Sequence, residues 1–66
     1  MKVWINGESL LLKPETTIRQ LLVEIKLENR RVAVELNEEI VPRSQHCTRQ
    51  IRHGDRVEIV HAIGGG

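Results

Sequence analysis

The chain has 66 residues, with ten Lys and Arg against nine Asp and Glu, and a single tryptophan as its only Trp, Tyr or Phe. A domain of this size buries only about 60% of the surface that its unfolded chain exposes, which leaves little room for a deep catalytic cleft. The charges are balanced and form no basic block. A nucleic-acid partner is therefore not expected, because it would need a clustered positive face and stacking aromatic side chains.

Cysteine usage and hydropathy indicate a protein of a reducing, aqueous compartment. Cys47 is the only cysteine, so no internal disulfide can form. Asn6, Gly7 and Glu8 interrupt the apolar run that a signal peptide would need near the start. No apolar stretch is long enough to span a bilayer. We expect a cytoplasmic protein without a membrane partner.

The first predicted element is a β-hairpin in the sequence KVWINGESLLLK, residues 2–13. Asn6-Gly7 is a preferred pair for a two-residue type I′ turn, in which both residues need positive φ. Alternation along the two strands then separates an inner from an outer face. The inner, core face receives Val3, Ile5, Leu10 and Leu12, and the outer face receives Trp4 and Leu11.

A short helix is predicted next. Pro14 ends the second strand, and Thr17 with Gln20 three residues later fits a capping box. Apolar residues then recur at helical spacing, at Ile18, Leu21, Leu22 and Ile25. The pattern predicts about three turns that end near Asn29.

Three further strands are predicted after the helix. Residues 32–36 alternate, with Val32, Val34 and Leu36 on one face. Residues 40–42 form a brief strand that Pro42 closes, which suits a sheet edge because proline cannot donate to a ladder. Residues 43–51 show no period and indicate an irregular crossover. After a turn at residues 53–55, the last strand runs over residues 56–63 with Val57 and Ile59 inward.

The predicted order is β-β-α-β-β-β, which indicates an α+β fold of four to five strands in a mixed sheet with one helix on one face. This is the β-grasp arrangement known from ubiquitin. The elements follow from periodicity, whereas the strand order, with the first and last strands central, is taken from the resemblance described below. We expect one β-grasp domain over residues 1–63 and a flexible glycine tail over residues 64–66.

The tail has the chemistry of an acyl donor. Gly64, Gly65 and Gly66 carry no Cβ, so such a tail can enter a narrow tunnel and present an unhindered carboxylate. Coupling of that carboxylate to AMP would give a mixed anhydride that a sulfur nucleophile can attack. If sulfur stays behind, the product is a thiocarboxylate, which is itself a nucleophile. The chain has no Gly-rich phosphate loop, so a partner would have to supply the ATP chemistry.

Three stretches carry a resemblance to a known family. They are the Asn6-Gly7 hairpin followed by TTIRQLL, the stretch LNEEIVPR at residues 36–43, and the end HGDRVEIVHAIGGG at residues 53–66. With these stretches the chain resembles, over essentially its whole length, the thiamine-pathway sulfur carrier proteins, a small ubiquitin-like family.

The resemblance implies specific partners. A ubiquitin-activating-type adenylyltransferase would use ATP and Mg²⁺ to adenylate Gly66, and a cysteine desulfurase or other persulfide donor would supply the sulfur. The Gly66 thiocarboxylate would donate its sulfur to thiazole synthase for the thiazole ring of thiamine. Gly65, with Gly64 as an extra residue of reach, would let Gly66 enter both partners' sites. The chain would bind no cofactor of its own and would not be an enzyme.

Three alternatives stay open from the sequence. The chain could be the small subunit of molybdopterin synthase, although those chains tend to be longer and lack the residues 40–43 IVPR. It could be a ubiquitin-like carrier that serves another sulfur-requiring pathway. It could also be a ubiquitin-like modifier or simple binding module, in which the tail is conjugated to a lysine or is inert.

Four residues are candidates for contact with a partner. Trp4 with Leu11 could form an outer docking patch, or the crossover segment could cover Trp4. Arg43 could contribute charge to docking, and His61 lies on the last strand close to the tail. Cys47 is interpreted as a partly buried structural residue, and no metal site is expected because the histidines lack the usual ligand spacing.

Overall fold

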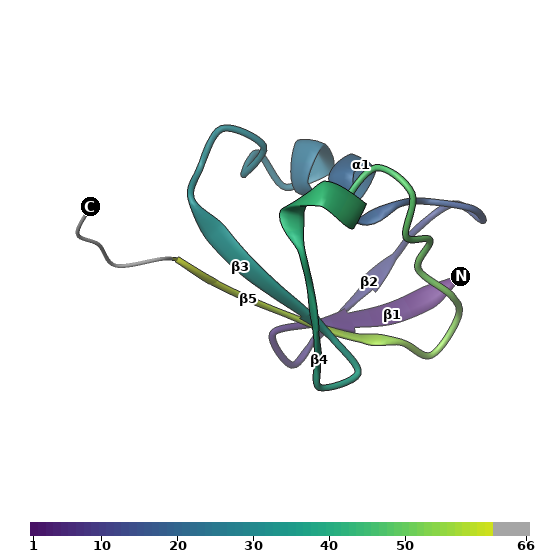
Figure 1. Ribbon diagram of the computed structural model, residues 1–66. Helices are drawn as coiled ribbons and strands as arrows, with labels where there is room; N and C mark the ends of the chain where they lie inside the picture. Colours follow the sequence, from purple (N-terminus) through teal and green to yellow (C-terminus); the bar gives the residue numbers. More distant parts are fainter. Residues whose placement is uncertain (62–66) are drawn as a thin grey trace.

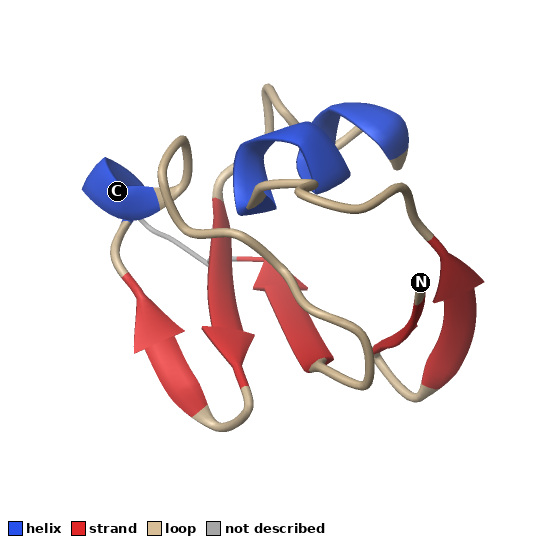
Figure 2. Cartoon of the chain, turned by 90° about the vertical axis from the view of Figure 1, so that its right-hand side faces the viewer, coloured by secondary structure: helices blue, strands red, loops and turns tan. Residues whose placement is uncertain are grey.

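In the computed structural model, which describes residues 1–61, five strands form one mixed sheet and one α-helix covers one face of it (Figure 2). The strand order is β2-β1-β5-β3-β4, so the first and last strands are central neighbours (Figure 1). The predicted β-grasp fold is therefore confirmed. The elements are β1 (Lys2–Ile5), β2 (Glu8–Leu11), α1 (Ile18–Glu24), β3 (Val32–Leu36), β4 (Glu39–Val41), the 3₁₀ helix η1 (Arg43–Gln45) and β5 (Arg56–His61).

Both hairpins of the sheet close with two residues at positive φ. Asn6 and Gly7 have φ of 50° and 85°, as the type I′ prediction requires. Asn37 and Glu38, between β3 and β4, have φ of 51° and 70°. Asparagine tolerates this region better than most residues, which explains its place first in each turn.

The helix begins where its sequence predicts. The Thr17 side chain accepts a hydrogen bond from the Gln20 amide at 3.2 Å, and the Gln20 side chain accepts one from the Thr17 amide at 2.9 Å. This reciprocal pair is the predicted capping box and satisfies two amides that the first turn leaves without partners.

The helix ends earlier than predicted, at Glu24 rather than near Asn29. Lys26 adopts φ of 64°, and its amide donates to Val23 at 3.1 Å while the Leu27 amide donates to Leu22 at 2.7 Å. These two bonds form a Schellman motif, which turns the chain out of the helix. Lysine does not favour a left-handed backbone conformation. The sequence pattern therefore could not predict that the helix ends there.

The core lies between the helix and the inner face of the sheet. A seven-residue helix is not stable alone, so burial of its apolar face holds it in place. Ile18 and Leu21 are fully buried there, and Ile5 and Leu10, predicted as core, are half-buried at its margin. The buried apolar side chains are Val3, Leu12, Ile18, Leu21, Leu22, Val34, Leu36, Val41, Ile51, Val57 and Ile59.

The crossover from β4 to β5 runs on the helix side of the sheet (Figure 1). It contains η1 and then pairs with the start of the helix, where the Ile51 amide donates to Thr16 at 2.8 Å. Ile51 fills the core from this segment. The crossover therefore closes the core on that side, and β4 is left as an edge strand, as predicted from Pro42.

Candidate functional site

The site expected from the sequence begins where β5 ends. Gly64, Gly65 and Gly66, and the predicted boundary after residue 63, lie outside the described residues, as do Ala62 and Ile63 of the predicted last strand. The structure therefore shows the strand that leads to the tail and the surfaces around it.

Strand β5 is held along both of its edges. It pairs in parallel with β1 through Trp4↔Arg56 and Ile5↔Val57. It pairs antiparallel with β3 over five residue pairs that run from Leu36↔Val57 to Val32↔His61. Because both neighbours are themselves paired to further strands, β5 is the strand that joins the two hairpins into one sheet.

Asn6 extends the β1 edge after the strand itself has turned away. Its Oδ1 accepts from the Ile59 amide at 2.8 Å, and its Nδ2 donates to the Ile59 carbonyl at 3.1 Å. The Asn6 amide also donates to Val57 at 2.9 Å. The side chain thus acts as one more backbone partner for β5 at a point where no β1 residue remains to pair with it.

Asn37 holds the other end of β5 in a similar way. Its Oδ1 accepts from the Arg56 amide at 2.9 Å, and its own amide donates to the Arg56 carbonyl at 2.8 Å. Its Nδ2 donates to Asp55 at 3.0 Å, and the second oxygen of Asp55 accepts from the Arg52 amide at 2.7 Å. The two turn asparagines therefore fix the start and the middle of the strand that carries the tail.

Trp4 and Leu11 both lie on the outer face of the sheet, away from the helix, as predicted. Trp4 is half-buried, and the Lys2 ammonium lies over its ring at 5.3 Å from the centroid. Leu11, paired with Lys2 across the hairpin, is 74% exposed. The crossover reaches Trp4 at its end, where the Trp4 amide donates to the Asp55 carbonyl at 3.0 Å and Gly54 lines a pocket together with Trp4. A docking role for these two residues stays a prediction.

Arg43 lies on η1 beside two other arginines that the sequence separates widely. Arg19, Arg30 and Arg43 come from the helix, the loop after it and η1, and they line one small pocket of about 110 Å³. His46 is buried below it, with Nε2 at 3.1 Å from the Val41 carbonyl oxygen. The carboxylate of Glu28 lines the same pocket, so Arg43 lies on a surface of mixed charge, and its proposed contact with a partner stays a prediction.

Cys47 is exposed, so its interpretation as a partly buried residue is wrong. In the turn after η1 the neighbouring His46 side chain points inward, and its carbonyl accepts from the Arg19 amide at 2.8 Å. Adjacent residues of such a turn point in different directions, which leaves Cys47 at the surface. The thiol is therefore available to reagents in solution.

His61 is the last residue that the structure describes, and it is exposed opposite Val32. Within residues 1–61, no group of three or more His, Cys, Asp and Glu side chains is arranged to hold a metal ion. In the same range, none of the helices has the length and apolarity that crossing a membrane requires.

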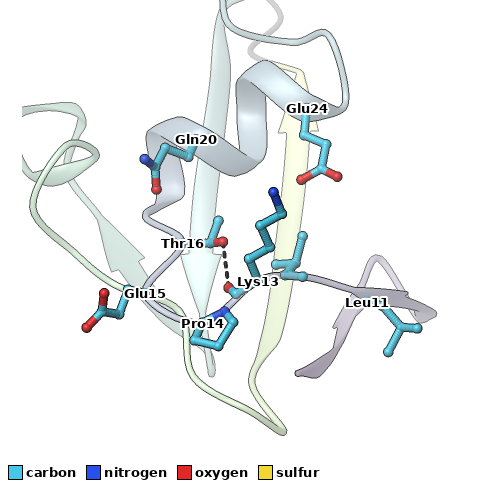
Figure 3. Close-up of a pocket in the computed structure, with 8 residues that line it drawn as sticks. Leu11, Lys13, Pro14, Glu15, Thr16, Gln20 and Glu24 are labelled. Carbon is cyan, nitrogen blue, oxygen red and sulfur yellow. Dashed lines mark hydrogen bonds between the residues drawn. The ribbon is translucent and has the colours of Figure 1, made fainter.

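A hollow of about 740 Å³ lies between the loop before α1 and the helix (Figure 3). Figure 3 shows Glu15 and Leu11 on opposite sides of it. Its one hydroxyl, Thr16 Oγ1, donates to the Lys13 carbonyl at 2.7 Å, and no Cys, Ser or His lines it.

Sequence reasoning missed the supporting asparagines and one feature of the outer face. The sequence indicates a turn at Asn6, but nothing local predicts that the side chains of Asn6 and Asn37 reach β5. Glu35 and Glu58 have no local signal either, and the register of β3 against β5 sets them directly opposite each other. Correct pairing of these two strands is the signal that would have found them.

The ThiS family model matches residues 3–66 of the chain. The sulfur carrier protein ThiS of Bacillus subtilis is 40% identical over 63 residues, which cover 94% of this chain and 96% of that protein. The Thermus thermophilus sulfur carrier protein ThiS is 41% identical over 64 residues, which cover 97% and 98%.

Two further similarities extend this result. A thiazole synthase of Paramagnetospirillum magneticum is 46% identical over all 66 residues, but the chain spans only about a fifth of that protein, 20% of its length. The crystal structure of a thiamine biosynthesis protein from Geobacter metallireducens has a TM-score of 0.87 with 29% identity, and each chain is covered completely. From these matches over nearly its full length, the chain belongs to the ThiS family.

Proposed function

We propose that Gly66, as the terminal residue, is adenylated and converted to a thiocarboxylate that donates sulfur to the thiazole ring of thiamine. The observation that carries this proposal is the family match, which runs through the glycine tail to residue 66. The relatives that support it over their whole length are named sulfur carrier proteins.

The chemistry needs two partner reactions. In the first, a carboxylate oxygen of Gly66 attacks the α-phosphorus of ATP and pyrophosphate leaves, which gives an acyl adenylate. In the second, a persulfide sulfur attacks the acyl carbon and AMP leaves. A thiol then reduces the resulting acyl disulfide, so that the terminal sulfur stays on Gly66. ATP, Mg²⁺ and the persulfide belong to the partners, which we take to be a ubiquitin-activating-type adenylyltransferase and a cysteine desulfurase or other persulfide donor.

The fold suits a carrier because the strand before the tail is fixed. Asn6 and Asn37 hold β5 from opposite edges, and Val57 and Ile59 anchor it in the core. A strand that is already fixed loses little conformational entropy when a partner binds it. The glycines of the tail then meet no steric barrier from a Cβ.

Thiazole synthase is the partner that the comparisons favour. In the Paramagnetospirillum magneticum and Magnetococcus marinus thiazole synthases, the matched region is 20% of the protein. A domain similar to this chain and the remainder of a thiazole synthase therefore share one polypeptide in those organisms. We infer that a thiazole synthase is the partner to which this domain delivers sulfur.

Intact mass spectrometry with alkylation tests the proposal. The chain, carrying Cys47→Ser, is incubated with its adenylyltransferase, ATP, Mg²⁺ and a persulfide donor. The substitution is needed because Cys47 is exposed and would also be alkylated. We expect a mass gain equal to the exchange of one oxygen for sulfur. The new group should react with the alkylating reagent, and fragment masses should place it on Gly66.

Alkylation separates the thiocarboxylate from oxidation of Met1, which adds nearly the same mass. Release of pyrophosphate without an alkylatable product would support activation but contradict the thiocarboxylate. Conjugates of higher mass, with an isopeptide bond from Gly66 to a lysine, would instead identify a protein modifier.

A further inference from the structure

The outer face of the sheet carries two glutamates directly opposite each other. In the antiparallel β3–β5 pair, Glu35 is the partner of Glu58. Their neighbours on either side, Val34↔Ile59 and Leu36↔Val57, point into the core, so both carboxylates point to the face that the helix leaves uncovered (Figure 2).

This pair of like charges has no compensation within the described residues. Like charges directly opposite in an antiparallel pair are destabilising. Neither carboxylate has a Lys or Arg nitrogen within the 4.0 Å of an ion pair in that part of the chain. Arg56 lies on the same strand but pairs across with Trp4. The arrangement therefore opposes folding and has no balancing contact among residues 1–61, as is expected of a functional surface rather than a structural one.

Apolar side chains frame the two glutamates. Ala33 pairs with Val60 in the neighbouring row of the sheet, and Ile40 pairs with Glu35 from β4. Val60 is 57% exposed and Ile40 is 75% exposed. We call this group the outer patch, and it consists of Ala33, Glu35, Ile40, Glu58 and Val60. Large β-branched side chains beside a charge pair form the kind of surface that excludes water when a partner covers it.

The outer patch lies at the end of β5 that leads to the tail. Val60 is the residue before His61, where the described part of the strand ends. A partner that covers the patch is thus brought to the root of the tail.

We propose that the outer patch docks the chain onto thiazole synthase, through a Lys or Arg of that enzyme that enters between Glu35 and Glu58 with apolar contacts on Val60 and Ile40. This inference rests on the proposed function. A cation between the carboxylates removes their repulsion, and exclusion of water by the apolar frame strengthens the attraction. Thiazole synthase is chosen over the adenylating enzyme because relatives carry a domain similar to this chain within thiazole synthases.

The test is the double substitution Glu35→Gln with Glu58→Gln, measured by calorimetric titration against the thiazole synthase of the same organism. We expect affinity to fall at least about tenfold, because two charge-assisted contacts are lost from a covered surface. The salt dependence of binding should also become shallower. In the free protein the melting temperature should rise by about 1–8 °C, since the repulsion is gone. Loss of binding together with gain of stability is a combination that damage to the fold cannot produce.

A matched control removes the same two charges from the helix side. Glu15→Gln with Glu24→Gln changes exposed carboxylates in the loop before α1 and on α1 (Figure 3). We expect this variant to bind thiazole synthase within about twofold of the unchanged chain. Val60→Ser tests the apolar frame separately and should also weaken binding, while the exposed position should leave the fold intact.

The outcomes separate the inference from the proposed function. If the unchanged chain binds and the Glu35/Glu58 variant binds equally well, the docking inference is overturned and the carrier function stands. The same holds if that variant is impaired only in adenylation, which would assign the patch to the adenylating enzyme. If the unchanged chain does not bind thiazole synthase at all, the partner in the proposed function is wrong and the inference is overturned with it. An unchanged or lowered melting temperature would contradict the premise that the pair is uncompensated.

Discussion

Asn6→Gly should loosen the strand that carries the tail without disturbing the turn. Glycine adopts the positive φ of this position freely, so the hairpin keeps its geometry. The substitution removes the two side-chain hydrogen bonds to Ile59. A net contribution of about 0.5–1.5 kcal/mol for each bond gives a loss of about 1–3 kcal/mol in the free energy of unfolding. For a domain of this length, that loss lowers the melting temperature by about 4–24 °C.

The assay combines urea denaturation with amide hydrogen exchange. Denaturation measures the global loss, and exchange at the Ile59 amide measures the local one, since that amide donates to Asn6 Oδ1. Exchange at Ile59 should accelerate by at least the factor that corresponds to the global change. The β5 amides on the other edge of the strand donate to β3. Their exchange rates should rise only by the factor that corresponds to the global loss of stability.

A graded control is available at the same position. Asn6→Asp keeps the acceptor for the Ile59 amide but loses the donor to the Ile59 carbonyl, so its stability should lie between those of asparagine and glycine. If Asn6→Gly is as stable as the unchanged chain and Ile59 exchanges at its original rate, the side chain does not support β5. If Asn6→Asp is less stable than Asn6→Gly, the predicted order of stability, and with it the contribution assigned to each bond, is wrong.

Three further predictions test the tail, the core and the helix end. One residue added after Gly66 should abolish sulfur loading, as read by mass spectrometry, with an unchanged melting temperature; normal loading would exclude the terminal carboxylate as the site. Leu21→Ala should lower the free energy of unfolding by about 2–5 kcal/mol in urea, because Leu21 is fully buried, whereas Val23→Ala on the exposed side of the same helix should cost far less; equal effects would contradict the assigned core face. Lys26→Gly should raise the melting temperature, because glycine removes the cost of a left-handed lysine, while Lys26→Ala should not; a gain with alanine would point to the charge instead.

Much of the fold was predictable because its determinants are local. Asn6-Gly7 specifies a turn by its own conformational preferences, and Thr17 with Gln20 specifies a helix start by two hydrogen bonds three residues apart. Alternation in β3 and β5 correctly assigned Val34, Leu36, Val57 and Ile59 to the core. Each of these signals is complete within a few residues of sequence.

The errors and omissions concern features that the apolar pattern of the sequence does not indicate. The end of α1 follows from a Schellman motif that places a lysine in a conformation its own preference opposes. Whether His46 or Cys47 is buried depends on packing of η1 against β4 and the helix. The Glu35–Glu58 pair exists only because β3 and β5, separated by the whole crossover, meet in one particular register. Such features follow from the assembled sheet and have no sequence signal of their own.

The central position of β5 has a mechanical consequence for a carrier. Under the proposed function a partner would be able to pull on β5, and a pull along the axis of the strand would act at right angles to its hydrogen bonds to β3. In this shear geometry the load is distributed over the bonds to β3, to β1 and to the Asn6 side chain at the same time, instead of opening them one after another. A strand at the sheet edge, peeled from its end, would have no such protection. We therefore expect the domain to resist a pull along β5 better than it would resist the same pull on an edge strand.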